Sequence, residues 1–268
     1  MERTTRRAAG LDAIHGERAR PAEGMGGLAK GLAIIEAFGQ QHRQLSISQA
    51  AQLTATSPAS ARRCLLTLES LGYLSFDGKF FRPTPRMVRL GAAYLETAPL
   101  ALLARPHLLA AREALGESIS LAVLESDESV FVARADAERI VSAGVRLGAR
   151  LPAHASATGR VLLAGLSDDD ADEVLARADL TSTTPKTLTI AEEIRQRIRQ
   201  ARDEGVAYTD EELELGIRTM AVPVRDNHGQ VQAAMSAAAF ASRITLDEMA
   251  AEFLPVLREH ADRLGRML

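Results

Sequence analysis

Two adjacent arginines, Arg62 and Arg63, follow a strong start signal for a helix, and this arrangement can read the bases of DNA. Arginine forms bidentate hydrogen bonds to guanine, and a serine hydroxyl bonds to either donors or acceptors on a base edge. The start signal is Ser57-Pro58, an N-cap residue followed by proline at the first helical position. The first turns of this helix hold the candidate base-reading residues Ser57, Ala59, Ser60, Arg62 and Arg63.

Candidates for contacts to the DNA backbone lie on both sides of this helix. Lys79 and Arg82 belong to an expected hairpin and suit phosphates or the minor groove. Ser48, Gln49 and Thr56 precede the helix and can contact phosphates, which would fix the register of the protein on DNA. Two alternatives stay open: each arginine is a solvated surface charge, or the whole module serves protein contacts.

The other residues that could do chemistry do not form a catalytic set. The six histidines lack the spacing of metal ligands, and the chain has neither a nucleophile elbow nor a His-Glu-x-x-His motif. A glycine-rich segment, residues 24–31, lacks the preceding strand and the Gly-Lys-Ser/Thr ending of a nucleotide-binding loop, so we interpret it as a hinge. The sequence therefore predicts no enzyme, no bound metal and no cofactor.

Two acidic runs, residues 168–170 and 210–212, admit a metal or acid–base interpretation. Carboxylates at a helix N-terminus interact favourably with the helix dipole, which accounts for the first run. The second run stands in an expected loop before Gly216, and its role stays open.

Composition and charge are those of a globular protein with one basic part. Of its 268 residues, 46% are hydrophobic and 25% are charged, and this length accommodates one large domain or two ordinary ones. Residues 1–97 carry 13 Lys and Arg against 8 Asp and Glu, whereas residues 98–268 carry 19 against 27. The basic part can meet a polyanion, although ordinary variation between two domains explains the same numbers.

Three further features bear on where the protein acts. No apolar run approaches the roughly 20 residues of a membrane span. The N-terminus lacks the apolar segment of a secretory signal. The single cysteine, Cys64, excludes a disulfide framework and a cysteine-based zinc cluster within one chain. We therefore expect a cytoplasmic protein without a membrane partner.

The spacing of apolar side chains predicts the elements that would position the basic residues. Three helices are expected: one over about residues 28–39, a short one after a serine cap at Ser46 or Ser48, and one over residues 57–72. Two aromatic-rich runs flank Asp77-Gly78 and predict a hairpin with a two-residue turn. Together these elements form a winged helix-turn-helix over residues 25–84, preceded by a flexible arm of residues 1–24.

The rest of the chain is predicted as a linker helix and an α+β domain. The linker helix spans residues 85–99, and its apolar stripe must pack on something, for which a partner chain is a candidate. Residues 100–268 alternate helices with antiparallel strands, which is typical of an α+β domain with a helix-covered sheet. Capping boxes at Thr189–Glu192 and Thr245–Glu248 are expected to open two of the helices. The strands are expected near residues 119–124, 130–133, 140–143, 206–209, 220–224 and 231–236.

Eight segments of the sequence recur in a known family. They are AKGLAIIEAF at 29–38, ARRCLLTL at 61–68, LGY at 71–73, GARLP at 148–152, TGRVLLA at 158–164, DEELELGIR at 210–218, AVPVRD at 221–226 and FLP at 253–255. In these segments the chain resembles the IclR-type transcriptional regulators over about residues 25–266. Within that family it resembles the branch that regulates aromatic-acid catabolism, the PcaR/PcaU/PobR-like regulators of the β-ketoadipate pathway.

The resemblance implies an architecture and a set of partners. It implies a winged helix-turn-helix, a linker helix and a C-terminal GAF-like effector-binding domain, residues 100–268, with an antiparallel sheet. It also implies that homodimers, often paired into tetramers, bind double-stranded operator DNA, and that the effector is a small organic acid, aromatic in this branch. Activation is slightly favoured over repression. The effector-contact positions that it implies are Ile140, Ala143, Leu151, Ala157, Thr158, Thr209, Ile217, Thr219, Ser236 and Ala238.

Residue chemistry at these positions suits a small acid. Ala157 and Thr158 start a helix, where free N–H groups attract an anion, and the hydroxyls and apolar side chains complete a small pocket. Two departures from the branch stand out. Residues 153–158 replace a Tyr-containing stretch and a Ser-Met pair, and residues 237–239 are alanines where the branch is more polar. The pocket is therefore expected to be larger, or to prefer a different acid.

From the sequence we expect a ligand-responsive DNA-binding regulator, whose ligand shifts the relative placement of two recognition helices. Two alternatives stay open. One is a regulator of the same family that senses a non-aromatic ligand such as a keto acid or a lactone. The other is a metabolite-binding protein or an enzyme that uses the C-terminal domain.

Overall fold

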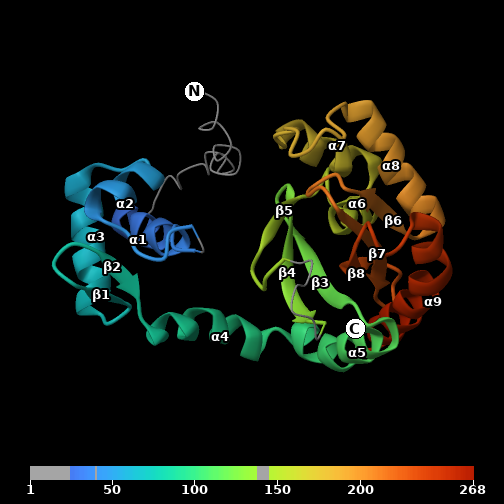
Figure 1. The fold of residues 1–268 in the computed structure, drawn as a ribbon, viewed down its shortest axis with the longest axis horizontal. Coiled ribbons are helices and arrows are strands. Elements are labelled where there is room, and N and C mark those ends of the chain that lie inside the picture. The colour runs from blue at the N-terminus through green and yellow to red at the C-terminus, as the bar shows by residue number, and fades with distance from the viewer. Residues whose placement is uncertain (1–24, 40, 138–144) are drawn as a thin grey trace. The chain divides into compact units, whose positions relative to one another are not determined.

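The computed structural model describes residues 25–39, 41–137 and 145–268. The chain divides into two compact units, Met1–Thr97 and Ala98–Leu268 (Figure 1). Each unit has an apolar core of its own. The arm expected over residues 1–24 and the strand expected over residues 140–143 lie outside the described residues.

The first unit begins with three helices, α1 (Gly26–Glu36), α2 (Ile47–Leu53) and α3 (Pro58–Ser70). A capping box opens α2: the Gln49 N–H donates to the Ser46 hydroxyl, and the Ser46 N–H donates to the Gln49 side chain. Ser57 caps α3, and Gly72, with a φ of +79°, follows its end. These caps are among those that the sequence predicts.

A short hairpin follows α3. β1 (Leu74–Phe76) pairs with β2 (Phe81–Pro83), and residues 77–80 connect the two strands. The expected two-residue turn is therefore wrong. The Asp77 carboxylate accepts hydrogen bonds from the N–H groups of Phe80 and Lys79, at 2.7 and 2.9 Å, and so closes a longer loop. These bonds, together with Arg82, lower the pKa of Asp77 to about 2.

The core of the first unit gathers side chains from its helices and its hairpin. They are Ile34, Leu45, Ala50, Ala51, Ala61, Leu65, Leu68, Leu74 and Phe81. Leu28 and Leu32 share the spacing that predicts α1, but they are 61% and 48% exposed, because α1 turns Ile34 inward instead. The first helix therefore leaves an apolar stripe uncovered in the single chain.

Two short elements follow the hairpin, the 3-10 helix η1 (Pro85–Met87) and α4 (Val88–Thr97). The single helix expected over residues 85–99 is thus divided, and Pro99 begins the next helix, α5 (Pro99–Leu115). Among the described residues no single helix is long and apolar enough to cross a membrane. Only the pair Pro85–Tyr94 and Pro99–Leu115 meets that test, when its two parts are counted together across a break.

Within the described residues, the second unit has one antiparallel sheet of six strands in the order β5-β4-β3-β8-β7-β6. The strands are β3 (Ser118–Glu125), β4 (Glu128–Ala135), β5 (Arg150–Pro152), β6 (Ala207–Asp210), β7 (Ile217–Arg225) and β8 (Val231–Phe240). β5 pairs with β4 at the sheet edge and is not among the strands expected from the sequence. Three residues that end in proline are too few to show an alternating pattern.

Helices cover both faces of this sheet (Figure 1). α5 and α9 (Leu246–Gly265) pack on one face, and α6 (Ala157–Ala164) packs on the other with α7 (Asp168–Arg177) and α8 (Ala191–Glu204). The expected capping box of Thr245 and Glu248 opens α9. The one expected at Thr189 is wrong, since Ile190 is the N-cap of α8 and makes no side-chain bond. The architecture is α+β, as the sequence predicts.

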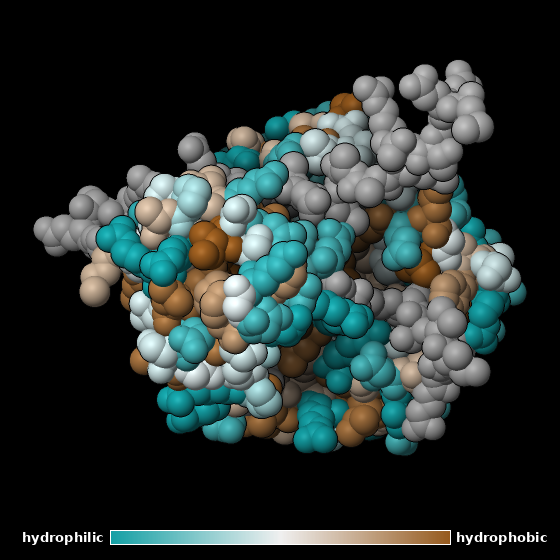
Figure 2. All heavy atoms as spheres, turned by 60° about the vertical axis from the view of Figure 1, so that its left-hand side comes forward, coloured by the Kyte–Doolittle hydropathy of each residue, from teal (hydrophilic) through white to brown (hydrophobic). Residues whose placement is uncertain are grey.

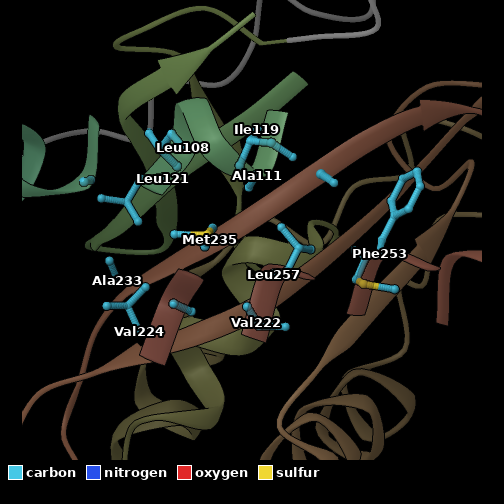
Figure 3. Packing of buried hydrophobic residues seen from close by; sticks show 14 of the residues in the cluster. Leu108, Ala111, Ile119, Leu121, Val222, Val224, Ala233, Met235, Phe253 and Leu257 are labelled. Carbon is cyan, nitrogen blue, oxygen red and sulfur yellow. The ribbon is translucent and has the colours of Figure 1, made fainter. Parts of the chain in front are cut away.

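The larger apolar core lies between the sheet and the α5–α9 layer. Figure 3 shows the side chains that gather there from the helices and strands, among them Leu108, Ala111, Ile119, Leu121, Val222, Met235, Phe253 and Leu257. β8 supplies alanines to both faces, Ala233 and Ala237 to this core and Ala234 to the cluster under α6. Such small side chains let the helices on both faces approach the centre of the sheet.

α6 lies so close to the turn before it that only glycine fits at residue 159. A Cβ atom there would lie 2.2 to 2.6 Å from backbone atoms of Ala153. We expect Gly159→Ala to destabilise the second unit by about 1–3 kcal/mol or more, because overpacking forces the backbone to move. Urea denaturation followed by circular dichroism measures this loss of unfolding free energy.

Gly91→Ala is the control for this substitution. No atom of the described residues lies within 4 Å of a Cβ at that position of α4. Alanine also favours the helix more than glycine does, so this variant should be at least as stable as the wild type. Wild-type stability of Gly159→Ala would contradict the packing described for α6.

Candidate functional site

The exposed face of α3 carries the paired arginines. Its other face packs in the core of the first unit, so Arg62 and Arg63 point to solvent together with Ser57 and Ala59. Neither guanidinium has a salt bridge or a hydrogen bond to any of the described residues. Two unpaired cations on one exposed helix face can meet the phosphates and guanine edges of a DNA major groove.

Ser60 does not belong to this face, in contrast to the sequence-based expectation. Its side chain is 6% exposed, and its N–H donates to the Ser57 hydroxyl at 3.3 Å. The buried side chain of Ser60 is therefore poorly placed for the expected base contact, and its backbone N–H supports the start of α3.

Among the expected backbone contacts, Ser48 and Lys79 are exposed. The Lys79 Nζ lies 5.2 Å from the centre of the Phe80 ring, on which it rests at the tip of the hairpin. Gln49 is exposed as well, but its side-chain oxygen is engaged in the capping box of α2. Only its amide nitrogen remains for a phosphate.

Thr56 and Arg82 already have partners within the first unit. The Thr56 hydroxyl lies 3.0 Å from that of Thr54. Arg82 bonds to the carboxylate of Asp77 and to the side-chain oxygen of Gln44, both at 2.6 Å. Arg82 therefore holds the hairpin loop as well as offering its remaining N–H groups to DNA.

A groove of about 710 Å³ lies beside Arg82. It is lined by Gln41, His42, Arg43, Gln44, Gln49, Phe80 and Arg82. Sequence analysis did not select Arg43, because it stands between two helices and outside any motif. Its position is found only when the loop before α2 folds against the hairpin.

In the second unit a buried ion pair anchors α6. Arg160 is 1% exposed, and its two terminal nitrogens bond to the two carboxylate oxygens of Glu212 at 2.8 and 2.5 Å. The Arg160 Nε donates to the carbonyl oxygen of His154 at 2.9 Å. The carbonyl oxygen of Glu212 accepts bonds from the hydroxyls of Thr183 and Thr187. This bidentate, fully bonded geometry is the arrangement in which a buried pair can offset its desolvation.

His154 lies beside this pair and is also buried. Neither of its ring nitrogens has a hydrogen-bond partner among the described residues. Burial and the nearby Arg160 guanidinium lower the pKa of His154, so the imidazole is neutral at neutral pH.

Structural bonds occupy the acidic run 210–212, which the sequence left open. Asp210 bonds to Arg218 at 2.6 Å and to Lys186 at 3.1 Å, and these cations lower its pKa. Glu211 bonds to Lys186 at 2.5 Å and accepts the Gly216 N–H at 2.7 Å, which lowers its pKa as well. In the part of the chain that the structure describes, no group of His, Cys, Asp and Glu could hold a metal ion.

The sheet face under α6 carries a set of hydroxyls, which we call the polar sheet face. Its members are Ser118, Ser120, Ser129, Thr209, Thr219 and Ser236. Strand register places Ser120 opposite Ser236, and Thr209 opposite Thr219. Since side chains alternate along a strand, the intervening residues face the α5–α9 core. The sheet is therefore apolar on the α5–α9 side, whereas the side under α6 mixes these hydroxyls with small apolar residues such as Ala221 and Ala234.

Two features of the polar sheet face suit a bound molecule. The hydroxyls of Thr209 and Thr219 lie 2.5 Å apart. The Ser236 hydroxyl has no hydrogen-bond partner among the described residues, although Ser236 is 7% exposed. Ala238 lies opposite Thr219 and adds little bulk there.

The start of α6 lies against this face. The Ser129 hydroxyl is 2.9 Å from that of Thr158 and 3.3 Å from that of Ser156, the N-cap of α6. The N–H groups of Ala157 and Thr158 make no hydrogen bond to the described residues. The positive end of a helix is thus directed at the polar sheet face, where an anion would be stabilised.

The remaining expected effector residues are placed as follows. Leu151 lies opposite Ser129 in the β4–β5 pair, and Ile217 begins β7 two residues before Thr219. Ile140 and Ala143 lie outside the described residues. The alternation of Ser118 and Ser120 with apolar residues is a period-two signal that selects two positions which sequence analysis missed.

Sequence models of known families match both units. The IclR helix-turn-helix domain matches residues 27–78, and the domain described as bacterial transcriptional regulator IclR C-terminal matches residues 92–266. The Pca regulon regulatory protein of Pseudomonas putida is 42% identical over 87% of this chain and 80% of that protein. The p-hydroxybenzoate hydroxylase transcriptional activator of Acinetobacter baylyi is 36% identical over 94% of this chain and 95% of that protein.

A solved structure is similar over both units. It is an IclR homologue from Microbacterium hydrocarbonoxydans complexed with 4-hydroxybenzoate, with a TM-score of 0.74 and 28% identity. The match covers 89% of this chain and 97% of that one.

Removal of Arg160 tests the buried ion pair. We expect Arg160→Met to destabilise the second unit by about 3–5 kcal/mol, because the Glu212 charge stays buried without its partner. Urea denaturation measures the change. Arg199→Met, which breaks an exposed pair with Glu192, is the control and should cost about 1 kcal/mol or less. Similar losses of unfolding free energy in the two variants would show that the buried pair contributes no more to stability than the exposed one.

Proposed function

Since the chain belongs to the IclR family of bacterial transcriptional regulators, we propose that it binds operator DNA through α3 and senses a small aromatic acid on the polar sheet face. The family consists of regulators rather than enzymes, in agreement with a sequence that has no catalytic set. The expected aromatic-acid branch is confirmed by its relatives, the Pca regulator and the p-hydroxybenzoate hydroxylase activator.

Arg62 and Arg63 carry the DNA-binding part of this proposal. They are exposed on the second helix of the helix-turn-helix, which is the helix that enters the major groove in this motif. Ser57 and Ala59 share the exposed face and can approach base edges. Lys79 and Ser48, also exposed, suit the flanking phosphates.

The chemistry of the polar sheet face suits an aromatic acid. The free N–H groups at the start of α6 favour a carboxylate. The Ser236 hydroxyl offers a hydrogen bond, and Leu151 and Ile217 offer apolar walls to a ring. The 4-hydroxybenzoate bound by the Microbacterium homologue has each of these parts, a carboxylate, a ring and a hydroxyl.

We propose a homodimer, or a pair of dimers, as the acting form. Apolar side chains are exposed on two helices of the first unit, Met25, Leu28 and Leu32 beside or on α1 and Val88, Leu90 and Tyr94 on α4. In Figure 2 apolar residues, in brown, interrupt the hydrophilic surface of the face shown. Exposed apolar stripes of this kind mark protein–protein contacts.

A dimer would couple the two activities. Two copies of α3 meet two DNA half-sites at a fixed spacing. A ligand that binds one arrangement of the effector units more tightly shifts the population towards it and changes the affinity for the operator. Activation, which the resemblance favours, is also the role of the Acinetobacter relative, a transcriptional activator. We expect the protein to act in the cytoplasm, where operator DNA lies.

A non-aromatic acid is the second candidate effector. Small side chains, Ala155, Ala157 and Ala238, lie at the start of α6 and on β8. They leave more room than the polar and aromatic residues that are typical of the branch, so a differently shaped acid fits the same polar groups.

Substitution of the paired arginines tests DNA binding. We expect Arg62→Ala and Arg63→Ala to weaken binding to the DNA upstream of the gene by about 1–3 kcal/mol each where the side chain contacts a base. A phosphate contact instead lowers the slope of affinity against salt by about 1. Fluorescence anisotropy over a salt series separates the two cases.

Arg199→Ala on α8 is the matched control, since it removes an exposed arginine of the second unit. Its affinity for DNA should equal that of the wild type. Mass photometry of the same complexes counts the chains bound per operator. Full affinity of the Arg62→Ala, Arg63→Ala double variant would overturn the assignment of α3 as the recognition helix.

A ligand panel tests the effector. We expect 4-hydroxybenzoate or protocatechuate to raise the melting temperature of the second unit. A ligand at 100 times its Kd stabilises by about 2.7 kcal/mol. Differential scanning calorimetry compares these acids with a keto acid and a lactone. A response to the keto acid or lactone alone would favour the second candidate, and no response to any of them would contradict the effector site.

A further inference from the structure

One arginine lies on the polar sheet face among its hydroxyls. Arg134 of β4 is opposite Ser120 of β3, and Ser120 is in turn opposite Ser236 of β8. The register therefore sets these three side chains in one row across three adjacent strands, on the side that faces α6. A β-bulge makes this possible: the β3–β4 register shifts after Leu121, so that Arg134 shares a face with Phe131.

The row is buried and held in place. The Arg134 side chain is 8% exposed, and its Nη1 donates to the Ser120 hydroxyl at 2.9 Å. Its Nε donates to the carboxylate of Asp136 at 2.5 Å. Ser236, next in the row, keeps a hydroxyl without a partner among the described residues. A donor fixed on Ser120 and a hydroxyl without a partner among the described residues thus stand on the two sides of Ser120 in this row.

The charges at the two ends of the polar sheet face differ. Asp136 forms an ion pair with Arg134 and offsets part of its charge, so this end acts mainly as a hydrogen-bond donor. The start of α6, with the free N–H groups of Ala157 and Thr158, carries the positive end of a helix dipole. A carboxylate is therefore better placed at α6, and a hydroxyl oxygen at Arg134.

The spacing of the two ends suits a molecule with an oxygen at each end. Ser129, which holds Thr158, pairs with Leu124, and Leu124 is four residues from Ser120 along β3. Four residues of a strand span about 13 Å. Between the two ends lie Ala122 and Phe131, a cross-strand pair that is buried yet belongs to neither apolar cluster of the second unit. They form an apolar floor for a ring.

We propose that Arg134, together with Ser120 and Ser236, binds the ring hydroxyl of an aromatic acid and so selects hydroxylated acids over unsubstituted ones. This inference rests on the proposed function, because it takes the polar sheet face as the effector site. The residues at α6 hold the carboxylate that all such acids share. Arg134, Ser120 and Ser236 contact the ring hydroxyl, which is the group in which these acids differ.

Calorimetric titration of the full-length protein with 4-hydroxybenzoate and benzoate tests the selection. We expect the wild type to prefer 4-hydroxybenzoate by about tenfold or more, as for one hydrogen bond to a charged group. In Arg134→Met the affinities for 4-hydroxybenzoate and benzoate should agree within about threefold. The affinity for 4-hydroxybenzoate should fall, whereas that for benzoate, which has no ring hydroxyl, should stay the same. Ser236→Ala, which breaks no hydrogen bond to the described residues, should reduce the preference too.

Arg225→Met is the control, since this exposed arginine at the far end of β7 should not alter the preference. Circular dichroism establishes that each variant is folded. If Arg134→Met does not fold, the effect of Ser236→Ala on the preference for 4-hydroxybenzoate is the test. Failure of the wild type to bind either acid would overturn the effector site itself. Binding with no preference, or a preference that survives both substitutions, would overturn only the role of the Arg134 row.

Discussion

The buried pair of Arg160 and Glu212 is the interaction on which the second unit depends. It joins α6 to the loop before β7, two segments 52 residues apart in sequence, and the threonines that bind the Glu212 carbonyl tie in a third. The position of α6 in turn decides where its N-terminus is directed. Because a lone charge at that depth is strongly unfavourable, the pair permits one placement of α6 and excludes slightly displaced ones.

The fixed start of α6 and the polar sheet face together form the proposed effector site, because the two faces of the sheet carry different side chains. One face is closed by α5 and α9 through aliphatic side chains, which supplies the stability of the unit. The other face keeps hydroxyls and Arg134, which supply recognition. Alanines of β8 point to both faces of the sheet. Their small side chains let α5 and α9 pack closely on one side and leave space for a ligand on the other. The α5–α9 side thus serves stability alone, whereas the α6 side combines packing and the buried ion pair with the groups proposed for recognition.

Local signals in the sequence predicted much of this fold, and contacts distant in sequence explain what they missed. Ser46, Ser57 and Thr245 mark helix starts by chemistry within four residues, so they are readable from sequence. The hairpin loop is not, because the Asp77 side chain replaces the expected turn. The hydroxyls Thr158, Thr209 and Ser236 came from the family resemblance, whereas Arg134 was missed because its neighbours in the row lie 14 residues away on β3 and farther still on β8.

The hydroxyl pair of Thr209 and Thr219 adds a different property to the same face. At 2.5 Å one hydroxyl must donate its proton to the other, and the second proton is then free to turn elsewhere. Either threonine can be the donor in this bond. When the bond reverses its direction, the pair can therefore bind a ligand group that donates or one that accepts a hydrogen bond. Arg134 has no such choice, since a guanidinium only donates. The polar sheet face thus combines Arg134, which only donates hydrogen bonds, with a threonine pair that can donate or accept. A bound ligand could therefore gain or lose a proton there and still keep a hydrogen bond to the threonine pair.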